Sequence, residues 1–198
     1  MGTRNLTVIV NNNEIKVAQY CQWDGYPSGQ GKKIVDFILN KYKPEKFKKK
    51  LNKITWINDY ELNNRWKSVG AKGDMVTFAI ADKFKEKYYW LSRNCGADIL
   101  ECIQDDKFKV DKVSNNLDFA NDSLFCEYSY VLNLDDETLE IYEGFNTDNL
   151  NNSNNFPYVE FKKDKDEKYS QVKLHSIFPF EVLDDLLMDH LEDHLSGE

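Results

Sequence analysis

Alternating apolar and polar residues near the start and the middle of the chain predict two β-hairpins. Residues 4–10 are rich in β-branched side chains, three consecutive asparagines follow them, and residues 14–21 alternate. Asparagines tolerate the positive φ angles of a tight turn, so this order is typical of a hairpin. Residues 124–132 and 138–143 repeat the pattern around a short acidic turn. The two hairpins predict an antiparallel sheet.

Between the hairpins, apolar residues recur at helical spacing. Residues 29–42 carry an apolar stripe, and Ser28 stands where it would cap that helix. Residues 44–53 begin with a proline, which suits the first turn of a second helix. Further short helices are expected at residues 57–68, 76–92 and 97–104.

The last third of the chain predicts more strands and a closing helix. Residues 156–162 and 169–175 read as edge strands, and residues 180–195 form an amphipathic helix with leucines on one side. The fold class predicted is therefore α+β, with helices packed on one face of the sheet. Within a single domain of residues 1–198 we expect a hairpin and loop (1–27), a helical part (28–105), strands (120–178) and the terminal helix (180–195).

Composition narrows the class of protein. The 198 residues are 41% hydrophobic and 14% aromatic, enough for a real core. No apolar run approaches the roughly 20 residues that span a bilayer, and the N-terminus lacks a signal-peptide pattern. We expect a soluble cytoplasmic protein that does not enter a membrane. The four cysteines have no zinc-knuckle spacing and the chain has no nucleotide-binding loop, so we expect no metal and no cofactor.

Charge is unevenly distributed, although the net charge is −8. Residues 32–53 hold nine lysines against two carboxylates, and the last eighteen residues hold seven carboxylates and no Lys or Arg. The lysine-rich helices are either a phosphate-contacting face or an ordinary solvated exterior. On the first interpretation the RNA-binding lysines are Lys32, Lys33, Lys48, Lys49 and Lys50.

Residues 19–31, QYCQWDGYPSGQG, are the strongest candidate for chemistry. The segment mixes aromatic, amide, carboxylate and glycine residues, which is typical of a shaped and partly exposed functional loop. If the first hairpin closes, Arg4 lies near Tyr20 and Gln22. Its guanidinium would then pair with Asp24 or bind a phosphate through two parallel hydrogen bonds.

The same residues predict roles in RNA cleavage. Asp24 is a candidate general base, Tyr20 and Tyr26 are candidate acid–base hydroxyls, and Trp23 offers a ring on which a base stacks. The candidate catalytic set is Arg4, Tyr20, Gln22, Asp24 and Tyr26. The alternative is a structural Arg4–Asp24 clasp that pins the loop to its hairpin. The sequence leaves both interpretations open.

Residues 1–7, MGTRNLT, followed by residues 17–31, VAQYCQWDGYPSGQG, resemble a family of small proteins from phages and mobile elements of Gram-positive bacteria. Looser similarity at residues 91–100, 126–135 and 139–144 extends the resemblance over roughly residues 1–145. The family includes anti-CRISPR proteins that inhibit type II-A Cas9 through its guide RNA. The resemblance implies that function here, with the N-terminal hairpin essential and no metal motif carried over.

The resemblance implies Cas9 and its single-guide RNA as partners, in the cytoplasm of a bacterial host. The leading expectation is an inhibitor that causes truncation of the guide, as a candidate Cas9-dependent ribonuclease. The alternatives are a non-enzymatic binder that blocks loading of guide or target, and an inhibitor of another bacterial defence enzyme. In the binder, the acidic C-terminal helix would imitate nucleic-acid phosphates.

Overall fold

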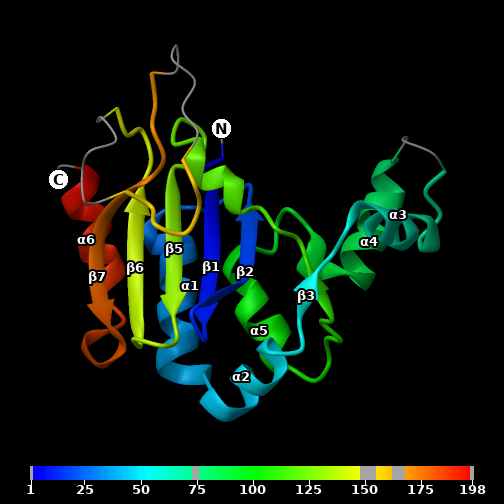
Figure 1. Cartoon of the computed structure of the whole chain (residues 1–198), viewed down its shortest axis with the longest axis horizontal. Helices are drawn as coiled ribbons and strands as arrows, with labels where there is room; N and C mark the ends of the chain where they lie inside the picture. Colours follow the sequence, from blue (N-terminus) through cyan, green and yellow to red (C-terminus); the bar gives the residue numbers. More distant parts are fainter. Residues whose placement is uncertain (1, 73–75, 148–154, 162–167, 197–198) are drawn as a thin grey trace.

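The computed structural model describes residues 2–72, 76–147, 155–161 and 168–196. Its centre is a sheet of strand order β2-β1-β5-β6-β7 (Figure 1). The strands are β1 (Asn5–Asn11), β2 (Glu14–Cys21), β5 (Tyr128–Asn133), β6 (Thr138–Glu143) and β7 (Lys173–Pro179). β1 runs parallel to β5, and the other neighbouring pairs are antiparallel.

The α+β class and both hairpins are confirmed. The turn between β1 and β2 contains Asn12 and Asn13 with φ angles of 58° and 57°, which asparagine tolerates. The hairpins meet through β1 and β5, and this contact is parallel. Local patterns do not specify it because the two strands are far apart in sequence. The sheet is therefore mixed, with mostly antiparallel pairs.

Both faces of the sheet are covered, and every residue of β1 is buried. On one face Ile9, Val17 and Leu132 pack with the helices in the larger core. On the other face Leu6 and Val131 pack in a second core, together with the later segments of the chain. Burial on both faces explains the nearly continuous apolar composition at the centre of β1.

The helices divide between the sheet and a projecting pair. A helical segment runs from η1 (Pro27–Gly31) through α1 (Lys32–Asp36) to η2 (Phe37–Lys41), and it packs on the sheet with α2 (Pro44–Leu51) and α5 (Ile99–Gln104). α3 (Asp59–Ser68) and α4 (Phe78–Lys87) stand to one side of the sheet (Figure 1).

Short elements complete the chain. They are β3 (Thr55–Trp56), η3 (Tyr89–Leu91), η4 (Gly96–Asp98), β4 (Lys112–Val113), η5 (Leu117–Asn121), η6 (Phe180–Val182) and α6 (Leu187–Ser196). β3 and β4 form a separate parallel pair. No helix in the described ranges is long and apolar enough to span a membrane.

Three local predictions need correction. Ser28 does not cap the first helix, which already begins at Pro27, and its backbone N–H donates to Glu192 Oε2 at 2.8 Å instead. Residues 156–161 contain turns rather than a strand, and residue 162 lies outside the described residues. The terminal helix is divided because Leu183 is extended, and the Asp184 side chain then accepts the N–H of Leu186 at 2.9 Å.

Candidate functional site

Backbone and buried hydrogen bonds fix the loop that follows β2. The Gly25 N–H donates to the Thr3 carbonyl at 2.9 Å, and the Gln30 N–H donates to the Asp24 carbonyl at 2.8 Å. The hydroxyl of Tyr130, in β5, donates to the Gly25 carbonyl at 2.7 Å. The loop is therefore attached to both hairpins and has a defined shape.

A buried glutamine holds the other side of the loop. Gln30 is only 2% exposed, its Oε1 accepts the Ala97 N–H at 2.8 Å, and its Nε2 donates to the Trp23 carbonyl at 3.4 Å. Gly96 has a φ of +48°, and a Cβ there would lie 2.5 Å from Gln30 Oε1. Position 96 therefore favours glycine, because any other residue would place its Cβ against Gln30.

Strand pairing decides which residues surround Arg4. β1 pairs antiparallel with the end of β2 and parallel with the start of β5. The residue before β1 therefore lies between the residue after β2 and the residue before β5. These three residues are Arg4, Gln22 and Glu127. The sequence predicted the first two as neighbours and missed Glu127, which comes from a distant part of the chain.

The Arg4 side chain is positioned but not neutralised. Its guanidinium lies 4.5 Å from the centre of the Phe125 ring, a cation–π contact, and its backbone N–H donates to Glu127 Oε1 at 3.2 Å. Its Nε is buried without a hydrogen-bond partner. Within the described residues, Arg4 forms no ion pair. Because Nε is closed to solvent, an oxyanion such as a phosphate would bind at the terminal nitrogens of the guanidinium.

Tyr20 lies beside this guanidinium. Its hydroxyl donates to Gln22 Oε1 at 2.6 Å, and its ring packs edge-on against Phe119 with centroids 5.0 Å apart. Burial raises the pKa of the Tyr20 hydroxyl, and the positive charges of Arg4 and Arg93 only partly oppose this effect. The hydroxyl therefore stays protonated at neutral pH and is a proton donor rather than a base.

Arg93 is a second cation that sequence reasoning did not select. It is exposed, and its backbone carbonyl accepts the Gln22 N–H at 3.0 Å. It forms no ion pair in the part of the chain that the structure describes. We call Arg4, Tyr20, Gln22, Arg93 and Glu127 the Arg4 cluster. It combines two cations, a protonated hydroxyl, an amide and a carboxylate.

Asp24 is not brought to the Arg4 cluster. Its backbone has a φ of +56° and its side chain is exposed. It lines a separate depression of about 560 Å³ with Lys32, Lys33 and Leu186, among others. No ion pair joins Asp24 to Arg4 among the described residues. The structure therefore shows neither the predicted clasp nor the predicted shared site.

Trp23 and Tyr26 lie at the surface. Each is 47% exposed. The Trp23 ring lies against Gly2, where a Cβ would be 2.1 Å from the ring, and the Tyr26 ring lies 6.3 Å from that of Tyr128. Each side chain keeps exposed surface that a base or another ring can contact, so the stacking and acid–base roles stay predictions.

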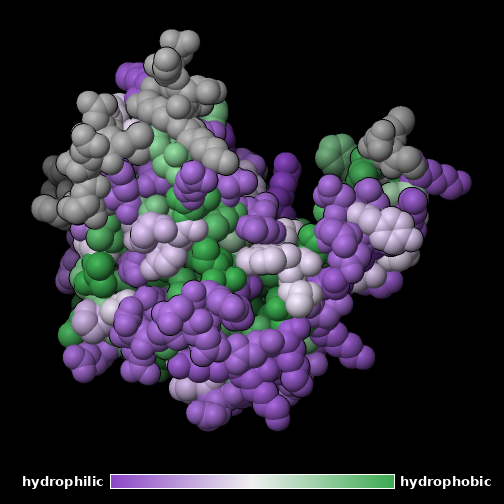
Figure 2. All heavy atoms as spheres, in the orientation of Figure 1, coloured by the Kyte–Doolittle hydropathy of each residue, from purple (hydrophilic) through white to green (hydrophobic). Residues whose placement is uncertain are grey.

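Most of the predicted RNA-binding lysines are used within the chain. Figure 2 shows a largely hydrophilic surface over α2, where Lys46 and Lys50 share the carboxylate of Asp106. The contacts are Lys32–Asp189 at 2.7 Å, Lys33–Asp98 at 3.0 Å, Lys50–Asp106 at 2.6 Å and Lys48 Nζ to the Leu134 carbonyl at 3.1 Å. Lys49 is exposed and lines a depression of about 600 Å³ with Lys46 and Lys48, among others. A phosphate would have to compete with these carboxylates.

Comparison with known proteins adds no relative to this description. No protein-family model, no curated protein and no solved structure matches the chain. Among the residues described, no group of three or more His, Cys, Asp or Glu side chains is placed to hold a metal ion.

Proposed function

We propose that the protein is an anti-CRISPR inhibitor of type II-A Cas9 that causes truncation of the guide RNA, and that the Arg4 cluster contacts the RNA. The observation that carries this proposal is the Arg4 guanidinium, which lies at the hairpin exit on Phe125 without an ion-pair partner in the described residues. The resemblance of residues 1–31 to phage proteins supports Cas9 as the target and the bacterial cytoplasm as the location.

The cluster holds the groups that metal-free RNA cleavage requires. Arg4 and Arg93 hold the phosphate and stabilise the charge that develops on it. Glu127 accepts the proton of the 2′-hydroxyl, whose oxygen attacks the adjacent phosphorus, and the bond to the 5′ oxygen breaks. Tyr20 donates its proton to that leaving oxygen. The products are a 2′,3′-cyclic phosphate and a 5′-hydroxyl. Glu127 then releases its proton to water and Tyr20 regains one from water, which restores both side chains.

The second candidate is a non-enzymatic inhibitor that holds the guide without cutting it. The position of Asp24 favours this candidate, because the base selected from the sequence lines a depression with Lys32 and Lys33 and forms no ion pair with Arg4 among the described residues. In that case Arg4 and Arg93, which form no ion pair in the described part of the chain, bind phosphate and prevent loading of guide or target.

A denaturing gel tests the proposal. Cas9, its single-guide RNA and the protein are incubated together, and guide length is followed with and without Cas9. We expect a shortened guide with a cyclic phosphate end, and a rate lowered roughly 100-fold or more by Arg4→Ala. Lys53→Ala is the matched control, because Lys53 is an exposed cation in the turn that follows α2.

The outcomes separate the candidate functions. If Cas9 is inhibited while the guide stays at full length at all times, cleavage is rejected and the non-enzymatic inhibitor is supported. Active Cas9 with an intact guide would reject both and leave another defence enzyme as the target. Arg4→Ala is informative only if its melting temperature stays near that of the parent, since loss of fold would remove activity for a different reason.

A further inference from the structure

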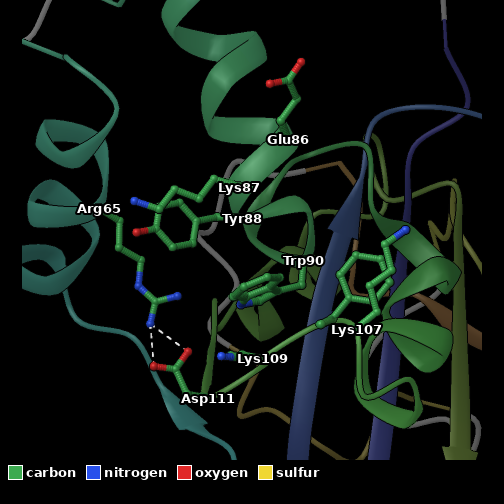
Figure 3. A pocket seen from close by; sticks show the side chains of 9 residues that line it. Arg65, Glu86, Lys87, Tyr88, Trp90, Lys107, Lys109 and Asp111 are labelled. Atoms are coloured by element: carbon green, nitrogen blue, oxygen red, sulfur yellow. Dashed lines mark hydrogen bonds and ion pairs between the residues drawn. The ribbon is translucent and has the colours of Figure 1, made fainter.

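A groove of about 480 Å³ lies where the projecting helices meet the rest of the protein (Figure 3). Its walls come from α3, from the end of α4 with η3, and from the segment that precedes β4. The lining residues are Arg65, Glu86, Lys87, Tyr88, Trp90, Lys107, Phe108, Lys109 and Asp111. A volume of this order suits a small ligand or one or two nucleotides.

One wall of the groove is a completed ion pair. Arg65 contacts both carboxylate oxygens of Asp111, at 2.8 Å each, and only 14% of its side chain is exposed (Figure 3). Arg65 also lies over the Tyr88 ring, 5.1 Å from its centre. The pair joins α3 to the segment before β4.

The remaining cations of the groove are not compensated by this pair. Lys87, Lys107 and Lys109 are exposed, and none of them forms an ion pair in the described ranges. Lys87 Nζ donates only to Ser68 Oγ, at 3.3 Å. The lysines of α1 and α2 differ, because most of them contact carboxylates. Glu86 is the remaining acid in the lining, so four cations face two carboxylates.

Aromatic rings accompany these cations. The Lys87 ammonium lies 5.1 Å from the centre of the Tyr88 ring, and Lys107 lies 5.3 Å from that of Phe108. Trp90 is buried behind them, with its Nε1 donating to the Lys112 carbonyl at 3.0 Å. Tyr88 and Phe108 are each partly buried, and the Tyr88 ring also packs against Phe84 and Trp90, with ring centroids 5.3 Å and 5.8 Å apart. Rings for bases and ammonium groups for phosphates are the two parts of a single-strand site.

We propose that this groove binds a single-stranded nucleic acid, with bases on Tyr88 and Phe108 and phosphates at Lys87, Lys107 and Lys109. A duplex hides the faces of its bases and would leave both rings unused, and an acidic peptide would use only the lysines. The further assignment of the strand to guide RNA rests on the proposed function. The groove would then hold the guide while the Arg4 cluster acts on it.

Fluorescence anisotropy of a short fluorescein-labelled single-stranded RNA, with the isolated protein and no Cas9, tests the proposal. At low salt we expect binding that weakens roughly tenfold or more in K107E/K109E, with a smaller dependence on salt concentration. Tyr88→Ala should also lose roughly tenfold, and Tyr88→Phe should keep most of the affinity because it keeps the ring. Lys85→Glu, on α4 but outside the lining, is the matched control and should change little.

Several results would contradict the proposal that the groove binds single-stranded nucleic acid. These are no binding of single-stranded RNA or DNA at low salt, equal affinity in K107E/K109E and the parent, or equal affinity for duplex RNA or polyglutamate. Tighter binding of DNA than RNA would overturn the assignment to guide RNA. The groove variants can lose oligonucleotide binding while the parent protein leaves the guide intact in the presence of Cas9. That result would support the groove as a nucleic-acid site and reject the proposed cleavage.

Discussion

The hydroxyl of Tyr130 donates a 2.7 Å hydrogen bond to the carbonyl of Gly25, from the middle of β5 to the loop after β2. Tyr130 is completely buried, and burial raises the pKa of its hydroxyl well above the ordinary value. The two residues are 105 positions apart in the chain. The second hairpin therefore contributes to holding the loop that leaves the first, next to the hydrogen bonds that involve Thr3 and Gln30.

Removing this hydroxyl should destabilise the protein. Tyr130→Phe leaves the Gly25 carbonyl without its buried donor, and we expect a loss of about 1–3 kcal/mol in the free energy of unfolding. Urea unfolding followed by fluorescence measures it. Tyr26→Phe is the control, because Tyr26 is 47% exposed, and it should change stability by less than about 0.5 kcal/mol. Equal stability of the two variants would show that the bond contributes nothing net.

Gly96→Ala should destabilise the protein and displace the residues that pack against Gly96 beside the loop after β2. The position combines a φ of +48° with a Cβ that would lie 2.9 Å from Cys21 Sγ. We expect a loss of about 2–4 kcal/mol, from backbone strain and from displacement of buried neighbours. Gly70→Ala separates the two causes, since Gly70 has a φ of +103° with open space around it. A Gly70 variant as unstable as the Gly96 variant would leave the steric contribution without support.

The contact between the two hairpin turns should depend on pH. Asp135 accepts the backbone N–H groups of Asn12 and Asn13 at 2.8 Å each, and these bonds lower the pKa of its carboxyl. A lowered pKa means that the contribution is complete above the ordinary value of about 4 and is lost as pH falls through the lower folded value. Stability should therefore fall below about pH 4.

Asp135→Asn isolates this contribution. At neutral pH the variant should lose about 1 kcal/mol, because a partly exposed contact between a carboxylate and two amides is screened by water. Its stability should also fall less steeply than that of the parent below about pH 4. If the free energy of unfolding falls equally steeply below about pH 4 in the variant and the parent, another carboxylate causes the loss of stability in acid.

Glu127→Gln tests the proton acceptor in the proposed cleavage. The amide oxygen can still accept the Arg4 backbone N–H, so the fold should persist with a change below about 0.5 kcal/mol. Guide truncation should slow roughly 100-fold because the amide cannot take a proton. Asp24→Asn is the paired variant. If Asp24→Asn abolishes truncation and Glu127→Gln is silent, the base predicted from the sequence is correct and the one chosen from the structure is wrong.

The sequence alone determined the elements whose signals are local. Alternation and the asparagine turn specified β1 and β2, and Pro44 marked the start of α2. The hairpin also placed Tyr20 and Gln22 near Arg4, because neighbours across a hairpin are set by a short stretch of chain. The α+β class followed from the same patterns.

Tertiary structure decided the contents of the site. Glu127 and Arg93 join Arg4 only through the pairing of β1 with β5 and the loop before η4, and no local pattern encodes contacts between such distant segments. Carboxylates from remote elements contact Lys32, Lys33 and Lys50, whereas Lys107 and Lys109 form no ion pair among the described residues. Counting charges along the chain could not distinguish these lysines, because whether a charge is free depends on what folds against it.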